Sequence, residues 1–430
     1  MLKLFSSALL LFSVSAFSQS YKKIHDQAVV IDTHNDVLSE VTMKGLNIEN
    51  DLTGKSYSDI ARFKKGGVDV QVFSIFCDER FGKDTAYKYA NIEIDSLYAI
   101  VSRNPDKMMM VTNPLQLQQA VKQKKLGCMM GVEGGHMIED NLDYLDAFYK
   151  RGVRYMTLTW NNSTSWATSA MDETAHPDLP GRKATNTQPV LQQNASHSKD
   201  SSKSGAGAQM ASPTGGSRKG AGLTQFGKQI VAHMNQLGMI VDLSHVGEQT
   251  FWDAINTTTK PVIASHSCVY NLCPVFRNLK DDQIKAIGKN GGIIDLNFYS
   301  GFVDGNYEKK QKLFHASHKK EIDSLKTLGK PIYEIDEWLA KTYTSEAAAL
   351  RPTLNQLLDH LDYIVKLIGV DHVGLGSDFD GISSSPQGLD DVTDFPNVTK
   401  ALVERGYSKG DIEKILGGNF IRVFKSNQTK

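Results

Sequence analysis

Residues 28–36 read AVVIDTHND, and this stretch is the most informative part of the chain for its fold. It begins as a nearly continuous apolar run and then changes to polar side chains, with His34 and Asp36 near its end. Continuous apolar runs are typical of parallel strands that are covered on both faces, whereas half-exposed strands alternate. The stretch therefore predicts a buried parallel strand that delivers polar groups at its C-terminal end.

Seven further runs of this kind follow, and helix-like segments such as Asn141–Arg151, Thr224–Leu237 and Thr353–Ile368 lie between the runs. Strands that alternate with helices predict βαβ units, and eight such units predict an α/β fold, a (β/α)8 barrel of the TIM type. A doubly wound open sheet is the alternative. We favour the barrel because polar residues gather at the C-terminal ends of the runs, where a barrel forms its site. The eight runs are Ala28–Asp32, Val68–Phe76, Gly127–Glu133, Tyr155–Trp160, Met239–Ser244, Pro261–Ser265, Gly292–Phe298 and His372–Ser377.

The first 18 residues are predicted to be a cleaved signal peptide. One lysine precedes an apolar run that ends in small residues, and this run is shorter than the ~20 residues that span a bilayer. A membrane anchor is the alternative. No cysteine follows the run, and the C-terminal residues are polar, so we expect neither a lipid nor a GPI anchor. The mature chain is expected to be secreted or periplasmic, without a membrane anchor.

Residues 19–430 are predicted to form a single barrel domain with two insertions. One, at about 171–222, contains a segment rich in Ser, Gly, Ala and Lys that cannot bury a core, so it is expected to be a flexible surface loop. The other, at about 301–351, is charged and amphipathic over Lys310–Leu328 and Ile332–Tyr343. It is expected to form a helical flap beside the barrel mouth.

Composition excludes several classes of function. Lys+Arg and Asp+Glu both number 48, so the formal net charge of zero argues against nucleic acid as a partner and against a polybasic membrane-surface protein. Four cysteines without CxxC spacing are too few for a disulfide scaffold and do not form a zinc ribbon. Hydrophobic residues, at 40%, suffice for a large core.

Metal-ligand side chains stand at the ends of four predicted strands. Each histidine alone is more often an ordinary core residue, but imidazoles and carboxylates delivered to one end of a barrel suit zinc or a similar ion. Five donors are one more than a single tetrahedral zinc needs, whereas two zinc ions that share a bridging carboxylate use all five. The candidate metal ligands are His34, Asp36, Glu133, His245 and His266.

Two further charged groups belong to the same end of the barrel. The eighth run leads into GSDFDG (376–381), where either Asp378 or Asp380 is expected to face the mouth and move a proton to or from the attacking water. Arg277 follows the sixth run and is suited to bind a substrate carboxylate in bidentate fashion. An ordinary surface arginine is the alternative.

In these residues and the segments around them, the chain resembles the membrane dipeptidase (renal dipeptidase-like) family of zinc metallopeptidases. The matching segments appear in family order and extend over nearly the whole mature chain. They are HND (34–36), EGGH (133–136), RYMTLT (154–159), residues 238–245, SHS (265–267), RNL (277–279) and GSDFDG (376–381).

The resemblance implies hydrolysis of dipeptides by a barrel with two zinc ions and suggests a homodimer. His34 and Asp36 would hold one zinc, His245 and His266 the other, and Glu133 would bridge them. Arg277 would bind the C-terminal carboxylate of the dipeptide, and Asp378 would act with Glu133 in catalysis and handle the proton. Family members often accept a D-residue at the C-terminal position.

Trp160 departs from the family pattern, which usually reads Thr-Leu-Thr-His at this point. We expect the indole to line the substrate pocket, with a role as hydrogen-bond donor or as core filler as alternatives. Two other functions stay open: an amidohydrolase for N-acyl amino acids or cyclic amides, and a non-catalytic barrel that retains its metal site. Zinc content and activity on N-blocked dipeptides distinguish these functions.

Overall fold

The computed structural model describes residues 21–175, 222–330 and 332–428. The predicted signal peptide (1–18) and nearly all of the predicted flexible insertion (171–222) lie outside these residues. Within the described part of the chain, no helix combines the length and the apolar character needed to cross a bilayer.

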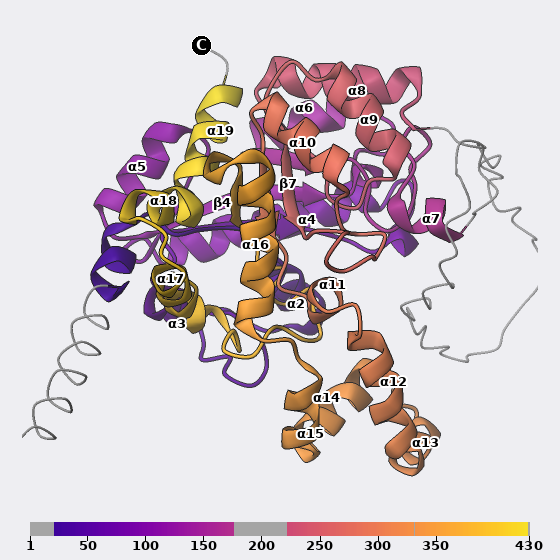
Figure 1. Cartoon of the computed structure of the whole chain (residues 1–430). Coiled ribbons are helices and arrows are strands. Elements are labelled where there is room, and N and C mark those ends of the chain that lie inside the picture. The colour runs from indigo at the N-terminus through magenta and orange to yellow at the C-terminus, as the bar shows by residue number, and fades with distance from the viewer. Residues whose placement is uncertain (1–20, 176–221, 331, 429–430) are drawn as a thin grey trace, which may run out of the picture.

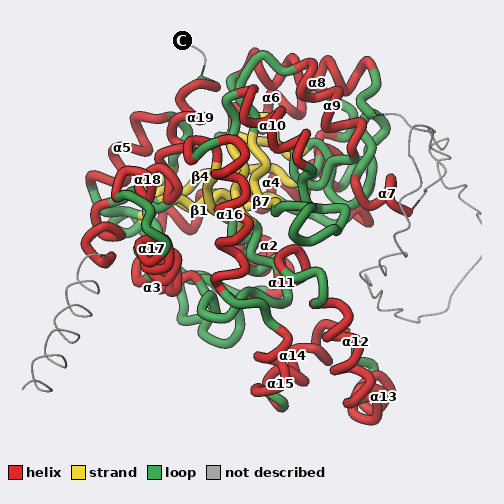
Figure 2. The backbone as a smooth tube through the Cα atoms, in the orientation of Figure 1, coloured by secondary structure: helices red, strands yellow, loops and turns green. Residues whose placement is uncertain are grey.

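Eight parallel strands form the barrel, with helices around it (Figures 1 and 2). Neighbouring strands pair in the order β1-β2-β4-β5-β6-β7-β8-β9, and the short β3 (Met108–Met110) pairs with β4 outside this ring. The ring strands are β1 (Ile31–Asn35), β2 (Val70–Ile75), β4 (Leu126–Glu133), β5 (Val153–Thr157), β6 (Ile240–Asp242), β7 (Ile263–Ser267), β8 (Ile293–Leu296) and β9 (Val373–Leu375).

The ring closes between its first and last strands, just beyond the end of β9. The N–H of Asp378 donates to the carbonyl of His34 at 3.0 Å, and the N–H of Asp36 donates to that of Phe379 at 2.9 Å. The (β/α)8 barrel is therefore confirmed in place of the open sheet. Each of the eight predicted runs overlaps a strand, although β5 ends at Thr157 and leaves Trp160 in the following loop.

One of the helices that cover the barrel, α8 (Gln225–Leu237), shows clear signals at both of its ends. Thr224 caps α8 by accepting the N–H of Gly227, and Gly238 ends the helix with a φ of 84°. The helices are α2 (Val37–Lys44), α3 (Ile60–Lys65), α4 (Ala86–Arg103), α5 (Pro114–Lys122), α6 (Leu142–Lys150), α7 (Ala170–Ala175), α8 (Gln225–Leu237), α9 (Glu248–Thr257), α10 (Asp281–Asn290), α11 (Ser300–Val303), α12 (Tyr307–Ser317), α13 (Lys319–Thr327), α14 (Ile332–Thr342), α15 (Thr344–Leu350), α16 (Leu354–Ile368), α17 (Phe395–Glu404), α18 (Lys409–Glu413) and α19 (Asn419–Asn427).

The two ends of the barrel differ in chemistry. Apolar residues at the starts of the strands, such as Ile31, Val70 and Ile263, form a cluster with Phe420 and Phe424 of α19. This helix therefore fills the N-terminal end with aromatic side chains. Polar side chains are left for the C-terminal end, where the βα loops begin.

Residues 307–350 leave the barrel as four short helices, α12 to α15, which project beyond α11 (Figure 1). The helices predicted over Lys310–Leu328 and Ile332–Tyr343 are confirmed. They enclose a small apolar cluster of their own, made by Phe314, Ile322, Ile335 and Leu339. Their action as a flap stays a prediction.

Candidate metal centre

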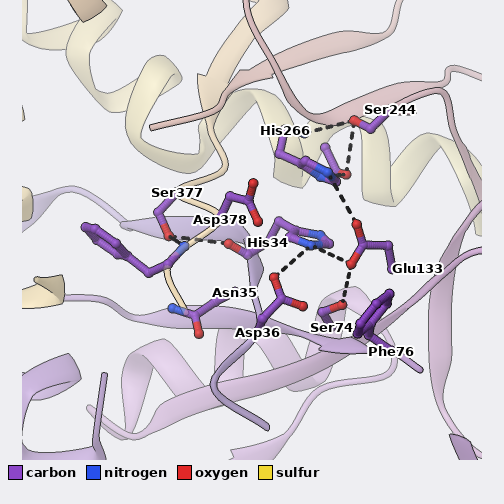
Figure 3. Close-up of polar contacts among 12 residues, drawn as sticks. His34, Asn35, Asp36, Ser74, Phe76, Glu133, Ser244, His266, Ser377 and Asp378 are labelled. Atoms are coloured by element: carbon purple, nitrogen blue, oxygen red, sulfur yellow. Dashed lines mark hydrogen bonds and ion pairs between the residues drawn. The ribbon is translucent and has the colours of Figure 1, made fainter. Parts of the chain in front are cut away.

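The five predicted ligands all lie buried at the C-terminal end of the barrel. Figure 3 shows four of them, His34, Asp36, Glu133 and His266. His34 and His266 belong to β1 and β7, and Glu133 is the last residue of β4. Asp36 is the N-cap residue of α2, and His245 lies in the loop after β6 with a φ of 64°. Left-handed backbone is costly for a residue other than glycine, so the surrounding loop must hold His245 in place.

Irregular strand pairing affects the orientation of two of the histidines. The register between β1 and β2 shifts between Asp32 and Asn35, and that between β7 and β8 shifts between Ala264 and Ser267. Each shift inserts one residue and contains a candidate ligand, His34 in one strand and His266 in the other. Bulges are common beside active sites because they redirect side chains.

Glu133 occupies the middle of the group, and its two oxygens face different ligands (Figure 3). Oε2 lies 3.3 Å from His34 Nε2, which is itself 3.4 Å from Asp36 Oδ2. Oε1 lies 3.0 Å from His245 Nε2 and 3.5 Å from His266 Nε2. A carboxylate in this position could serve as a ligand to two ions, one at each oxygen.

All three imidazoles are oriented by an oxygen beside Nδ1. When Nδ1–H donates to such an oxygen, the other nitrogen, Nε2, presents its lone pair to the centre. The acceptors are Tyr155 Oη for His34 at 2.8 Å, Asn161 Oδ1 for His245 at 3.1 Å and Ser265 Oγ for His266 at 2.8 Å.

Tyr155 can reach His34 because Gly131 leaves room for its ring. A Cβ atom at position 131 would lie 2.0 Å from the tyrosine ring, so only glycine fits between these strands. The hydroxyl of Tyr155 donates to the carbonyl of Thr33 at 3.0 Å. Its oxygen is thereby left to accept from His34.

The buried polar atoms fit a metal centre. His245 Nε2 and His266 Nε2 are 2.9 Å apart, and two lone pairs at this distance repel unless a cation lies between them. His34 Nε2 and Asp36 Oδ1 are buried without a hydrogen-bond partner. His34 and two neighbours, Glu133 with His266 or Asp36 with Asp378, place ligand atoms within 4.8 Å of one another. This donor set suits a divalent ion such as zinc.

The pKa values of His245, His266 and Glu133 also suit metal ligands. Burial lowers the pKa of His245 to about 4, with a contribution from Arg277, and burial also holds the pKa of His266 well below its usual value. Both are therefore neutral, as ligands must be. Burial disfavours ionised Glu133, but His34 and His245 outweigh burial and hold the pKa of this carboxyl well below its usual value.

The structure separates the two candidate aspartates of the eighth strand end. Asp378 lies beside His34 and Asp36, and Asn297 Nδ2 donates to its Oδ2 at 2.8 Å. Burial, reinforced by Asp36 and Glu133, raises the pKa of Asp378 well above its usual value. Asp380 instead accepts the N–H of Tyr57 at 2.8 Å and so holds the loop after α2.

Arg277 is buried next to the centre and forms no ion pair with a carboxylate of the described residues. Its Nη2 donates to the carbonyl of His266 at 3.3 Å, and its guanidinium lies 5.3 Å from the ring centroid of Phe302. Burial lowers the pKa of Arg277 to about 10, so the group stays charged at neutral pH. A buried cation without an acidic partner is suited to an anionic ligand.

Trp160 lies in the loop after β5 and is half-buried. Its ring is 4.9 Å from that of Phe76 at an interplanar angle of 60°, and Phe76 lies beside Ser74 and Glu133 in Figure 3. The two rings thus form an aromatic wall next to the ligands. The sequence analysis did not identify Phe76 or the three groups that orient the imidazoles.

Together the fold and the site define a metal-dependent peptide hydrolase of the (β/α)8 type. The family model of membrane dipeptidases (peptidase family M19) matches residues 18–185 and 196–430, and the chain belongs to this family. An uncharacterised dipeptidase of Schizosaccharomyces pombe is 29% identical over an alignment of 429 positions, which covers 95% of this chain and 83% of that protein.

Solved structures have the same fold. The probable dipeptidase PvdM from Pseudomonas aeruginosa superposes with a TM-score of 0.70 at 23% identity, over 96% of this chain and 99% of that chain. A metallo peptidase from Rhodobacter sphaeroides, liganded with a phosphinate mimic of the dipeptide L-Ala-D-Ala, gives 0.68 at 21% identity, over 93% and 99% of the two chains.

The position of Glu133 predicts the effect of Glu133→Gln. A neutral amide cannot bridge two cations, so this variant should lose more metal than a variant that lacks one terminal ligand, such as His245→Ala. Metal analysis of both purified variants, after equilibration with zinc, measures this difference. Two ions bound to Glu133→Gln with wild-type affinity would show that the carboxylate does not bridge.

Proposed function

We propose that this chain is a secreted dipeptidase that uses two zinc ions to hydrolyse dipeptides. The observation that carries this proposal is Glu133, whose two oxygens divide four other ligands into two pairs. Arg277, a buried cation without an acidic partner among the described residues, adds a place for one carboxylate near the same centre.

These five residues would hold the zinc ions, which would supply polarisation of the scissile carbonyl and a water that is nucleophilic at neutral pH. The chain itself supplies position and proton transfer. Arg277 binds the C-terminal carboxylate of the substrate and thereby sets the distance from that end to the scissile bond. Asp378 takes a proton from the attacking water and returns it to the leaving amine.

The distance between Arg277 and the centre also limits substrate length. A free carboxylate one residue beyond the scissile bond satisfies the guanidinium, whereas a longer peptide places an amide there. The L-Ala-D-Ala mimic bound by the Rhodobacter protein supports a D-residue at the C-terminal position as an acceptable substrate. Trp160 and Phe76 wall the side of the pocket that faces the N-terminal residue.

Export of the protein is part of the proposal and is supported by the apolar N-terminal run that ends near Ser18. N-terminal sequencing of the protein recovered outside the cytoplasm should find a chain that begins near this residue. Recovery only inside the cells, with Met1 retained, would contradict export but not the activity.

A substrate panel with wild type and Arg277→Met tests the activity. Wild type should release amino acids from free dipeptides but not from N-acetylated ones, and a chelator should abolish the reaction. A charge-assisted bidentate contact contributes roughly 1.5–3 kcal/mol, so kcat/KM of Arg277→Met should fall by ~10- to 100-fold for free dipeptides.

C-terminally amidated dipeptides are the control, because they lack the carboxylate that Arg277 binds. Their slower hydrolysis should be nearly the same in both proteins. An equal loss on free and amidated substrates would show that Arg277 only supports the fold, and cleavage of N-acetylated substrates alone would point to an acyl-amino-acid hydrolase.

Asp378→Asn should retain both metals but lower kcat by ~10²- to 10⁴-fold, the range of a general acid–base group. Asp380→Asn is the matched control, because Asp380 is partly buried, as Asp378 is, but accepts a hydrogen bond from the loop at Tyr57. Single-turnover assays with metal analysis compare the variants. A larger kcat loss in Asp380→Asn than in Asp378→Asn would show that Asp378 is not the residue that transfers the proton.

A further inference from the structure

Asp242 is a fully buried carboxyl at the end of β6 that has no part in the mechanism above. It accepts four hydrogen bonds, and none of the donors is a charged group. Oδ1 accepts the N–H groups of Ser244 at 3.1 Å and Ser265 at 2.9 Å. Oδ2 accepts the hydroxyls of Thr157 at 2.5 Å and Ser265 at 2.6 Å. Both the backbone and the side chain of Ser265 are thus tied to this one carboxyl.

The hydroxyl of Ser265 lies between Asp242 and a candidate ligand. Its oxygen is 2.6 Å from Asp242 Oδ2, 2.8 Å from His266 Nδ1 and 3.4 Å from Ser244 Oγ. The serine hydroxyl donates its hydrogen bond to the nearest and most negative acceptor, which is the carboxyl oxygen of Asp242. The lone pair of the serine oxygen is then left to accept from His266 Nδ1.

This direction fixes the tautomer of His266. With its proton on Nδ1, the imidazole presents the Nε2 lone pair to Glu133 and His245. If the hydroxyl turned around and donated to Nδ1, the proton would move to Nε2 and His266 could not bind a cation. Ser265 is fully buried, so water does not compete for either position.

The same unit recurs where the barrel closes. Asp32 of β1 accepts the N–H of Ser377 at 2.8 Å and its hydroxyl at 2.7 Å, and it also accepts the N–H of His34 at 3.4 Å. In both units an aspartate binds the backbone and the hydroxyl of a serine, which lies on the adjacent strand β7 in one unit and just beyond the end of β9 in the other. In both, the residue after the serine, His266 or Asp378, faces the centre. The repetition indicates that these aspartate–serine hydrogen bonds position the side chains of His266 and Asp378.

We infer that Asp242 is a positioning residue for the metal centre, which acts through the hydroxyl of Ser265 to hold His266 as an Nε2 ligand. The inference rests on the zinc centre of the proposed function but not on its substrate. Outer partners of ligating histidines typically contribute 10- to 100-fold in metal affinity. Removal of the relay should therefore weaken zinc binding without loss of the fold.

The test is the zinc affinity of Ser265→Ala, Ser265→Thr and Asp242→Asn, measured by competition with a chromophoric chelator. Ser265→Ala should bind the weaker of its two zinc ions ~10- to 100-fold less tightly than wild type. Ser265→Thr retains the hydroxyl and should stay within about threefold of wild type. Asp242→Asn should lose at least as much zinc affinity as Ser265→Ala. Its amide N–H2 would donate to the oxygen of Ser265, so the serine hydroxyl would donate to Nδ1 of His266 instead of accepting from it.

Ser385→Ala is the control for loss of a buried hydroxyl, since Ser385 donates to the carbonyl of Leu389 instead of contacting a histidine. It should bind zinc as wild type does. Thermal unfolding of each metal-free protein shows whether the variants are folded. Wild-type affinity in Ser265→Ala or Asp242→Asn would overturn the inference, as would a loss in Ser265→Thr as large as that in Ser265→Ala.

The design keeps the inference separate from the proposed activity. Zinc binding that weakens in Ser265→Ala would support the relay even if no dipeptide were cleaved. Wild-type protein that bound no zinc would overturn both the relay and the proposed zinc centre.

Discussion

The carboxylate of Glu133, buried among three imidazoles, is the interaction on which the rest of the site depends. An ionised carboxylate at this depth costs several kcal/mol unless positive charge lies beside it. His34 lies beside this carboxylate, and burial lowers the pKa of His34, but Tyr155, Glu133 and Asp36 raise it well above its usual value. Arg277 is a more distant cation. Divalent ions beside both oxygens would add to this compensation, because a bound cation is often the largest local charge in a site.

Unusual backbone conformations occur at the end of the barrel that holds this carboxylate. Apolar strand starts and the aromatic residues of α19 fill the N-terminal end, so that end contributes stability without chemistry. At the other end, bulges in β1 and β7 and the left-handed backbone of His245 and Asp378 aim individual side chains. Such conformations persist only where neighbouring structure holds them. The hydrogen bonds of Asp32 and Asp242 supply that support one layer below the ligands.

The sequence predicted the barrel and the five ligand positions because both follow from local pattern. Apolar runs mark buried parallel strands, and the residue types at their ends are visible without a fold. Two of the three orienting groups could not be found this way, since Asn161 and Tyr155 contact histidines 84 and 121 residues away, respectively. Strand parity also failed to separate Asp378 from Asp380, because both lie beyond β9 in left-handed backbone, where alternation no longer applies.

A departure at position 160 can leave the ligands intact because adjacent residues of this loop have different partners. The neighbour that supports His245 is Asn161, and Trp160 packs against Phe76 instead. The two tasks, orientation of a ligand and shape of the pocket, are thus carried by adjacent residues of one loop. Either residue can change without the other. A family histidine at position 160 would alter the wall and its polarity, whereas the hydrogen bond to His245 Nδ1 would remain. Substrate preference can therefore vary in this loop while the ligands and their supports stay constant.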